Sequence, residues 1–553
     1  MQTAVFEAEN DVADCTTKAN SAILHAGYDP EPGTRMARLN VEGVALAKEI
    51  CARLDVPYLQ CGSLVLALSP EELPHLQKLY ENGIANGVPG IRLLSAEETL
   101  AMEPNLAPTV VGALYAPSAA IVSPWEFALA MAEVAVRNGV ELRRSCRQLT
   151  RIPAEEYMAY SELTNRASDV WHKAKEENDF ASFCPILQEL VEYNRKFAGY
   201  YDAEKAPYDA LLNEYERGVD TQQLDVFFDT LRKGLVPLIR AIGEKPQIDD
   251  SFLHLEYPVE QQKAFADYLM EVMGLDRGHC GLGETEHPFT LEFNNKDVRI
   301  TTNYDLHNVA SSMYSVLHEG GHALYELGIR DDLQYTCLTG GVSMGVHESQ
   351  SRFYENLIGR SRAFIGAIYP KVQEFFPAQL GNVTAEQFYR AVNKVEPSLI
   401  RTESDELTYC LHIMIRHELE KAFMNGEITV DEIPALWNQK YQDYLGVTVP
   451  DDAQGCLQDV HWTMPAGYFP SYALGSAYGV QILRTMEKDF DVFTCAAKGD
   501  LLPIRDWLKA HVFSIASITT PDEWIRAITG ESLNPDYFLT YLEEKFSALY
   551  ELP

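Results

Sequence analysis

The pattern of apolar and polar positions changes once along the chain, about a quarter of the way in. Before that point, short β-like runs such as 63–68 alternate with helical stretches such as 124–138, which is typical of an α/β unit. Beyond it helices dominate, and the stretch after Pro153 repeats apolar residues every three or four positions. These repeating positions are Tyr160, Leu163, Ala167, Val170, Trp171 and Ala174. The sequence therefore predicts a mainly α-helical domain over residues 149–553, preceded by an incomplete α/β segment over residues 1–148.

One β-like segment interrupts the helices, between residues 289 and 304. Its two runs, 289–293 and 298–302, alternate apolar and polar residues on either side of Asn294 and Asn295. Two alternating runs joined by a short polar turn predict a β-hairpin.

Composition and charge exclude several classes of function. The 553 residues, 46% of them hydrophobic, are enough for more than one buried core. Against 45 Lys and Arg stand 81 Asp and Glu, and the net charge of −36 would repel nucleic acid and anionic membrane surfaces. No apolar run reaches the roughly 18 to 20 residues that a membrane span needs. The ten cysteines are scattered without a CxxC pair, and the N-terminus lacks the pattern of a signal peptide, so we expect free thiols and a cytoplasmic protein.

The strongest chemical signal is the HExxH motif of residues 318–322, which lies in a predicted helix over 308–327. Four residues advance a helix by slightly more than one turn, so His318 and His322 emerge on one face and can share a metal ion. Glu319 lies beside them, where it can act on a metal-bound water. The alternative is a helix whose two histidines only form hydrogen bonds.

Two further features favour the metal site over that alternative. Gly320 and Gly321 each cost the helix about 1 kcal/mol relative to alanine, which indicates a close approach to the backbone, such as a metal site with bound substrate. Gly328 is expected to cap the end of this helix. Glu348 follows His322 by 26 residues on the next predicted helix. Two His and one Glu with an open fourth position form the ligand set of a catalytic zinc site.

Six short motifs follow one another in order along the helical region. They are His287-Pro288-Phe289, Asp297 to Thr301, His318 to His322, His347-Glu348-Ser349-Gln350, Ile400 to Asp405 and Gly455 to Trp462. With these motifs, residues 149–553 resemble the carboxypeptidase Taq family of zinc metallocarboxypeptidases. One departure is Ser404, where the family usually has a small apolar residue.

The resemblance implies both a ligand set and a mechanism. His318, His322 and Glu348 would hold zinc, and Glu319 would be the general base. The metal lowers the pKa of a bound water, Glu319 takes a proton from it, and attack follows on a carbonyl that the same metal polarises. The resemblance also implies a homodimer, zinc or cobalt as the metal, and peptide substrates trimmed of C-terminal residues other than proline.

The oxyanion that develops in such a reaction needs a fixed hydrogen-bond donor. Within the stretch 467–472, Tyr472 is the first candidate, and His461 is the second. The alternative for either residue is a packed aromatic ring or a structural hydrogen bond.

Arg401 and Arg299 are candidates for binding the terminal carboxylate of a substrate, because a guanidinium group pairs with a carboxylate through two hydrogen bonds. Arg401 is expected on a helix of its own, with Asp405 one turn further on to hold it. The alternative is that Arg401 and Arg299 form structural ion pairs with Asp405 and Asp297. The hairpin that carries Arg299 is expected to present an edge strand beside the zinc helix, along which an extended peptide could align.

The N-terminal region carries a second resemblance. The matching stretches are 7–12, 16–21, 25–29 and 121–126. Residues 3–143 resemble an interior piece of FAD-dependent oxidoreductases of the glycerol-3-phosphate dehydrogenase and 2-hydroxyglutarate oxidase type. This resemblance implies that Glu7 would bind the adenosine ribose and that the turn 16–21 would line the flavin pyrophosphate. However, no GxGxxG precedes Glu7, and Cys15 replaces a glycine that the family prefers, so a functional FAD site is not expected.

Both regions are shorter than the families they resemble. The first segment lacks the phosphate-binding turn of a dinucleotide fold, and the second lacks helical residues that the peptidase family carries before the position of Leu149. The sequence therefore predicts a fusion near residues 144–149. Two alternatives to an active carboxypeptidase stay open, namely an FAD-dependent oxidoreductase and an inactive fusion of two truncated proteins.

Overall fold

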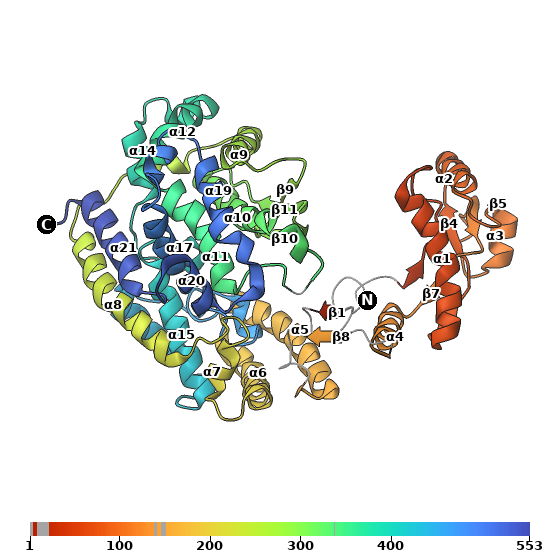
Figure 1. The fold of residues 1–553 in the computed structure, drawn as a ribbon, viewed down its shortest axis with the longest axis horizontal. Coiled ribbons are helices and arrows are strands. Elements are labelled where there is room, and N and C mark those ends of the chain that lie inside the picture. Colours follow the sequence, from red (N-terminus) through yellow and green to blue (C-terminus); the bar gives the residue numbers. More distant parts are fainter. Residues whose placement is uncertain (1–3, 8–21, 138–140, 145–150, 337) are drawn as a thin grey trace. The chain divides into compact units, whose positions relative to one another are not determined.

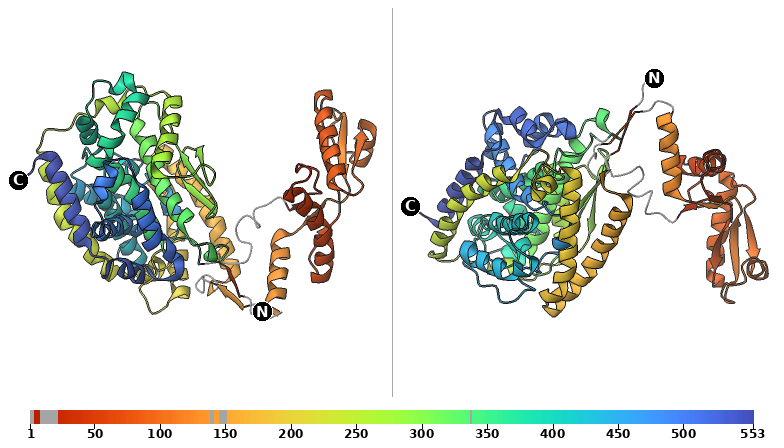
Figure 2. Two further views of the ribbon diagram at one scale, coloured as in Figure 1. Left: turned by 45° about the horizontal axis from the view of Figure 1, so that its top comes forward. Right: turned by 90° about the horizontal axis from the view of Figure 1, so that it is seen from below.

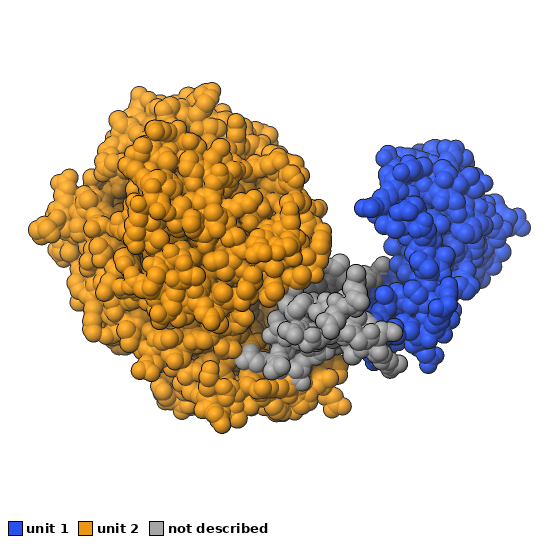
Figure 3. All heavy atoms as spheres, in the orientation of Figure 1, with its two compact units in different colours: residues 1–147 blue, residues 148–553 orange. Residues whose placement is uncertain are grey.

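The computed structural model describes residues 4–7, 22–137, 141–144, 151–336 and 338–553. The chain divides into two compact units, unit 1 over residues 1–147 and unit 2 over residues 148–553 (Figure 3). This division falls one residue before the boundary expected from the sequence. Each unit buries its own apolar core, as separate domains do.

Unit 1 combines short strands with helices. Its strands are β1 (Ala4–Glu7), β2 (Ile23–Leu24), β3 (Tyr58–Leu59), β4 (Ser63–Ala67), β5 (Arg92–Ser95), β6 (Gly112–Ala116), β7 (Ala120–Val122) and β8 (Glu141–Arg144). Its helices are α1 (Arg35–Leu54), η1 (Pro70–Glu72), α2 (Leu73–Asn86), α3 (Ala96–Met102) and α4 (Pro124–Arg137). Strands β1 and β8 pair in parallel, whereas β2-β7-β3 and β4-β6-β5 form antiparallel sheets. Leu76 and Leu79 of α2 are buried with Leu114 of β6, and the predicted α/β segment is confirmed.

The flavin-related positions of unit 1 are only partly within the described residues. Glu7 ends strand β1. Cys15 and the turn 16–21 lie outside the described residues. The expected lack of a functional FAD site therefore stays a prediction.

Unit 2 is built mainly of helices, with one small sheet (Figures 1 and 2). Its α-helices are α5 (Ala154–Glu177), α6 (Phe180–Tyr201), α7 (Pro207–Leu212), α8 (Thr221–Gly243), α9 (Val259–Met273), α10 (Val309–Gly328), α11 (Met344–Arg352), α12 (Arg362–Phe375), α13 (Pro377–Leu380), α14 (Ala385–Val392), α15 (Tyr409–Asn425), α16 (Ile433–Leu445), α17 (Pro470–Met486), α18 (Val492–Ala496), α19 (Leu502–His511), α20 (Pro521–Thr529) and α21 (Pro535–Tyr550). The short 3-10 helices are η3 (Ser251–His254), η4 (Asp331–Leu333), η6 (Arg401–Glu403), η7 (Val430–Glu432), η8 (Val460–Thr463) and η9 (Phe513–Ile518), and η5 (Phe353–Gly359) is a π-helix. The first helix, α5, starts directly after Pro153, and most of its predicted apolar positions are buried. The mainly helical fold is confirmed.

The sheet of unit 2 contains the predicted hairpin and one strand that the sequence did not reveal. Strand β10 (Thr290–Asn294) pairs antiparallel with β11 (Asp297–Thr302), as predicted. Strand β9 (Cys280–Glu284) pairs with β11 in parallel. Its sequence, with Gly281 and Gly283, has none of the β-branched residues that indicate a strand. In the described sheet β10 is an edge strand.

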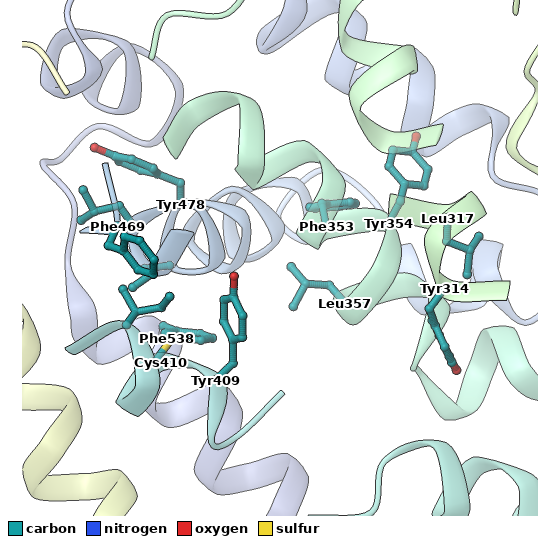
Figure 4. Packing of buried hydrophobic residues seen from close by; sticks show 14 of the residues in the cluster. Tyr314, Leu317, Phe353, Tyr354, Leu357, Tyr409, Cys410, Phe469, Tyr478 and Phe538 are labelled. Atoms are coloured by element: carbon teal, nitrogen blue, oxygen red, sulfur yellow. The ribbon is translucent and has the colours of Figure 1, made fainter. Parts of the chain in front are cut away.

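Glycines let helices α10, α11 and α17 pack closely in the core of unit 2. Figure 4 shows part of this core, to which Leu317 of α10 and Tyr478 of α17 contribute. A Cβ atom at Gly321 would lie 2.7 Å from Cα of Ser351 in α11, and one at Gly320 would lie 2.6 Å from the Met273 methyl group. The expectation that bound substrate explains these two glycines is wrong, because neighbouring helices occupy the space.

Gly328 also has a different role from the predicted one. It is the last residue of α10 rather than a left-handed cap, and Ile329 continues in an extended conformation. A Cβ atom at 328 would lie 2.9 Å from Cβ of Phe513, so close packing of that side chain accounts for the glycine.

Two expectations from the sequence concern the cysteines and the membrane-spanning segments. The cysteines that the structure describes, namely Cys51, Cys61, Cys184, Cys280, Cys410, Cys456 and Cys495, are all free thiols. Among the described residues, no helix combines the length and the apolar character that crossing a membrane demands.

Candidate active site

Helix α10 presents both histidines of the HExxH motif on one face. The helix begins after Asn308, whose side chain accepts a hydrogen bond from the Ser311 backbone N–H and so satisfies a free amide of the first turn. The imidazole rings of His318 and His322 have centroids 5.0 Å apart. The two rings are therefore close enough to share a ligand.

Helix α11 brings Glu348 against these two rings. It begins after Ser343, whose side chain accepts a hydrogen bond from the Val346 N–H. Oε2 of Glu348 lies 3.6 Å from Nε2 of His318 and 3.4 Å from Nε2 of His322. Within the described residues, these three side chains are the group whose donor atoms, all within 4.8 Å of one another, could hold a metal ion.

The hydrogen bonds around the two histidines fit such a metal ion. Nδ1 of His318 lies 2.8 Å from Oε2 of Glu355, and Nδ1 of His322 lies 2.6 Å from Nδ1 of His347. Because each Nδ1 has a partner, each Nε2 is left to face Glu348. Two imidazole nitrogens and one carboxylate oxygen match the protein donor set of a catalytic zinc ion.

Arg352 and Glu355 form hydrogen bonds to two members of the donor set, Glu348 and His318. Nε of Arg352 donates to Oε1 of Glu348 at 2.7 Å, and its Nη1 donates to Oε2 of Glu355 at 3.1 Å. Burial acts to raise the pKa of Glu355, but Arg352 and His318 outweigh it and lower that pKa to about 2. Neither residue was predicted from the sequence. Their positions four and seven residues after Glu348, on one helix face, were the available signal.

Glu319 lies next to the donor set and is held by the sheet. Oε2 of Glu319 accepts a hydrogen bond from the Thr290 hydroxyl at 2.6 Å. Burial raises the pKa of Glu319 above its ordinary value. Since Thr290 belongs to β10, an edge strand does lie beside the HExxH helix.

Arg401 is buried, but in a different setting from the predicted one. It lies in the 3-10 turn η6 rather than on a helix. Its Nε and Nη2 each donate to one oxygen of Asp459 at 2.9 Å, and its Nη1 donates to the Tyr409 hydroxyl at 3.3 Å. The expected partner, Asp405, instead accepts hydrogen bonds from the backbone N–H and hydroxyl of Thr408. The expectation that Asp405 holds Arg401 is therefore wrong, because the Asp405 carboxylate is bonded to the turn of residues 406–408 that precedes α15 (Tyr409–Asn425).

Tyr409 connects Arg401 to the candidate metal ligands. The guanidinium of Arg352, which is bonded to Glu348, lies over the Tyr409 ring, with Cζ 4.3 Å from the ring centroid. The Tyr409 hydroxyl accepts from Arg401. One continuous set of contacts thus joins Glu348 to Arg401. Nothing in the sequence marked Tyr409, which is one aromatic residue in an apolar stretch.

Tyr472 and His461 lie beside Arg401. Cζ of Arg401 is 5.2 Å from the centroid of the Tyr472 ring, and the Tyr472 hydroxyl donates to the Tyr468 hydroxyl at 3.2 Å. The His461 ring stacks on Tyr468 with centroids 5.8 Å apart, and its Nδ1 lies 3.5 Å from Oδ1 of Asp459. Both predicted donors therefore share this cluster with Tyr468, which the sequence analysis did not single out.

Arg299 is not brought to the site. In the hairpin it lies directly opposite Leu291, and it pairs with Asp297 at 3.0 Å, with both side chains exposed. Thr290, which contacts Glu319, is the neighbour of Leu291 along β10 and so points to the opposite face of the sheet. Arg299 therefore lies on the face away from Glu319, in the ion pair that was its alternative.

Comparison with known proteins gives two matches. Residues 125–546 match the family model described as carboxypeptidase Taq (M32) metallopeptidase, and residues 1–159 match the model described as FAD dependent oxidoreductase. Both matches agree with the resemblances in the sequence. They overlap around the boundary between the two units.

Relatives of the larger match cover most of the chain. Carboxypeptidase 1 of Bacillus subtilis (strain 168) is 43% identical over 422 residues, which are 75% of this chain and 84% of that protein. Thermostable carboxypeptidase 1 of Thermus thermophilus is 39% identical over 75% of this chain and 83% of that protein. The crystal structure of the M32 carboxypeptidase from Deinococcus radiodurans R1 superposes with a TM-score of 0.72 at 36% identity, covering 76% of this chain and 84% of that chain.

Relatives of the smaller match are only partly covered. Glycerol 3-phosphate dehydrogenase of Caloramator mitchellensis is 47% identical over 166 residues, which are 30% of this chain and 34% of that protein. The human mitochondrial L-2-hydroxyglutarate dehydrogenase is 44% identical over 100 residues, which are 18% of this chain and 22% of that protein. The chain therefore spans about a third or less of these two proteins.

Proposed function

The chain belongs to the carboxypeptidase Taq (M32) family of metallopeptidases, and from this premise we propose that it removes C-terminal residues from peptides with a zinc ion held by His318, His322 and Glu348. The observation that carries the proposal is the convergence of these three side chains, whose donor atoms lie within 4.8 Å of one another. Peptide hydrolysis at a metal site is the activity that the family shares.

Zinc is the metal that this donor set favours, and cobalt accepts the same ligands. When bound, zinc would lower the pKa of a coordinated water and polarise the scissile carbonyl. Glu355 is hydrogen-bonded to Nδ1 of His318, and His347 to Nδ1 of His322. These contacts orient the Nε2 atoms of both ligands toward the metal position. Arg352 keeps the Glu348 carboxylate ionised and fixed.

Glu319 is the proposed general base. Its carboxylate takes a proton from the attacking water and later delivers it to the leaving amine. Thr290 holds one carboxylate oxygen, which leaves the other free to receive the proton. Burial raises the pKa of Glu319 above its ordinary value, which makes its carboxylate a better proton acceptor.

Arg401 is the residue that we propose binds the substrate's terminal carboxylate. A guanidinium group has five N–H donors, and Asp459 and Tyr409 take three of those on Arg401 among the described contacts. Asp459 occupies the side formed by Nε and Nη2, and one N–H on each of Nη1 and Nη2 remains without a partner among the described contacts. Two such donors can bind a carboxylate in the bidentate manner.

Tyr472 and His461 remain the candidate donors to the oxyanion. The Tyr472 hydroxyl donates to Tyr468 in the structure, and rotation of this hydroxyl would let Tyr472 donate to the oxyanion when substrate is bound. His461 is held between Asp459 and Tyr468, a setting that fixes its ring. Removal of either donor should lower kcat rather than raise KM.

Four finer points complete the proposal, and the family resemblance supports two of them, the homodimer and the specificity. We propose a homodimer, a cytoplasmic location, broad specificity for C-terminal residues other than proline, and no bound FAD. The last point has support from the sequence, because Cys15 replaces a glycine that the FAD-dependent family prefers.

One set of measurements on the purified chain tests the main proposal. Metal analysis should find about one zinc per chain, a chelator should abolish peptide hydrolysis, and added zinc should restore it. Peptides with an amidated C-terminus should be poor substrates beside their free counterparts. Full activity without metal would contradict the zinc proposal, whereas equal cleavage of free and amidated peptides would contradict the role of the terminal carboxylate. An absorbance scan for flavin on the same sample tests the alternative that unit 1 is an active oxidoreductase.

A further inference from the structure

Behind His322 lies a chain of two hydrogen bonds that the proposed reaction does not use. Nδ1 of His322 is 2.6 Å from Nδ1 of His347, and Nε2 of His347 is 2.7 Å from Oε1 of Glu326. Glu326 follows His322 by one turn of α10, and His347 comes from α11. Glu326 is almost fully buried, so its carboxylate depends on this contact.

The His347 ring is fixed by its surroundings. A Cβ atom at Gly341 would lie 2.9 Å from Cδ2 of His347. The Tyr325 ring packs against the His347 ring, with the two centroids 5.1 Å apart. The His322 and His347 rings themselves are 4.6 Å apart. The ring of His347 therefore keeps Nδ1 toward His322 and Nε2 toward Glu326.

With both imidazoles neutral, the two hydrogen bonds assign each hydrogen along this chain. Two Nδ1 atoms that face each other share a single hydrogen, so one imidazole donates and the other accepts. The carboxylate of Glu326 accepts, which places a hydrogen on Nε2 of His347 and leaves Nδ1 of a neutral His347 bare. His322 then donates from Nδ1, and its Nε2 keeps the lone pair that faces Glu348 at 3.4 Å.

We propose that His347 and Glu326 are positioning residues that hold His322 in the tautomer able to bind the metal ion. The inference rests on the proposed role of His322 as a ligand. It goes further by giving a function to the histidine of the 347–350 motif and to Glu326, which no sequence motif marks. Both act through His322 and touch neither the substrate nor the metal.

The other histidine ligand provides an internal contrast. Nδ1 of His318 meets the carboxylate of Glu355 directly, at 2.8 Å. A carboxylate can only accept, so it fixes the tautomer of His318 without help. At His322 the neighbour is an imidazole, which could donate or accept, and the second hydrogen bond to Glu326 removes that ambiguity.

The test measures metal affinity in the full chain rather than activity. The zinc dissociation constant is obtained by competition with a chelator for the unaltered protein and for His347→Leu, His347→Asn and Glu326→Gln. His347→Leu should weaken binding roughly 10- to 100-fold, the range seen when such supporting partners are lost. His347→Asn should recover most of this loss, because the Asn carbonyl oxygen can take the place of Nδ1 as acceptor. Glu326→Gln should fall between the unaltered protein and His347→Leu, because its amide can either accept or donate.

Three comparisons keep the result decisive. Thermal unfolding of the metal-free variants separates lost stability from lost affinity. A purely structural role of His347 predicts that His347→Leu and His347→Asn weaken zinc binding equally. That outcome, or a dissociation constant for His347→Leu within about twofold of the unaltered protein, would overturn the inference. His322→Ala is the control for the proposed function itself. If His322→Ala binds zinc as tightly as the unaltered protein, the ligand set is wrong and this inference fails with it.

Discussion

The candidate site has two sides that are held in place by different kinds of contact. The metal side consists of His318, Glu319, His322 and Glu348, and the arginine side consists of Arg401, Tyr409, Asp459, His461, Tyr468 and Tyr472. On the metal side the functional groups stand at helical spacing on two adjacent helices. On the arginine side Arg401 is fixed by Asp459, which is 58 residues away in the chain. Local periodicity builds the first side, whereas long-range pairing builds the second.

This difference predicts different consequences of substitution. Ligands on rigid helices are positioned before the substrate arrives, so changes on the metal side should act on the chemical step. The buried guanidinium on the arginine side still has donors to offer, so changes there should act on substrates that carry a free carboxylate. The following substitutions test this division in order of expected effect.

Glu319→Gln should have the largest effect. The substitution keeps the shape of the side chain but removes the base, so kcat should fall about 100- to 10,000-fold while zinc stays bound. Metal analysis together with steady-state kinetics measures both quantities. Loss of zinc from this variant would mean that Glu319 belongs to the metal site in another role.

Arg401→Ala should come next. It should lower kcat/KM for free peptides roughly 30- to 900-fold, which corresponds to a loss of about 2 to 4 kcal/mol in transition-state stabilisation. The reason is that the buried Asp459 and the substrate carboxylate are left unpaired. Arg401→Lys is the matched control, since it keeps the charge but loses the fork. Amidated peptides should lose little in either variant. An equal loss for free and amidated peptides would show that Arg401 only supports the fold around Asp459.

Thr290→Val should have a moderate effect. It removes the hydroxyl that holds Glu319 and keeps the shape of the side chain, so the lost hydrogen bond to a charged group should cost about 1.5 kcal/mol, or roughly tenfold in kcat. Thr301→Val on the neighbouring strand is the control, because its hydroxyl bonds Thr285 and the backbone of Phe289 rather than Glu319. If both variants lose activity equally, the effect belongs to the sheet and not to the base.

Arg299→Ala should have the smallest effect. Its partner Asp297 is exposed, and such surface pairs and substitutions change stability by only about 0.5 kcal/mol. We expect kcat/KM within about twofold of the unaltered chain for free peptides. A large and selective loss for free peptides would show that Arg299 reaches the substrate despite lying on the far face of the sheet.

The sequence predicted which ligand candidates of the metal side come together, because helical periodicity is a local property. Four-residue spacing put His318 and His322 on one face, and the ligand class then made Glu348 the natural third donor. The hairpin was predictable for the same reason, since alternation and a turn lie within a few residues of each other. Strand β9 was not, because a parallel partner without β-branched residues carries no local signal.

The arginine side was harder to predict, because pairing between distant residues has no period. The sequence suggested Asp405 for Arg401 on the basis of helical spacing, but the chain forms a 3-10 turn there and Asp459 takes that place. Arg299 was a candidate because of its residue type. Only the register of β10 against β11 assigns it to the other face of the sheet.

The contacts around α11 have a consequence for how this protein can change over evolutionary time. The helix that carries Glu348 is confined on both sides by glycines, with Gly321 of α10 facing the backbone at Ser351 and Gly475 of α17 facing Glu348 itself, where a Cβ atom would lie 2.8 Å from that residue's own Cβ. At Gly321 the opposing atoms are main chain, so no smaller side chain exists that could make room by a compensating substitution. Two residues that bear no catalytic group should therefore be among the slowest to vary in this chain, and a library randomised at position 321 should return almost only glycine among its folded, metal-binding members.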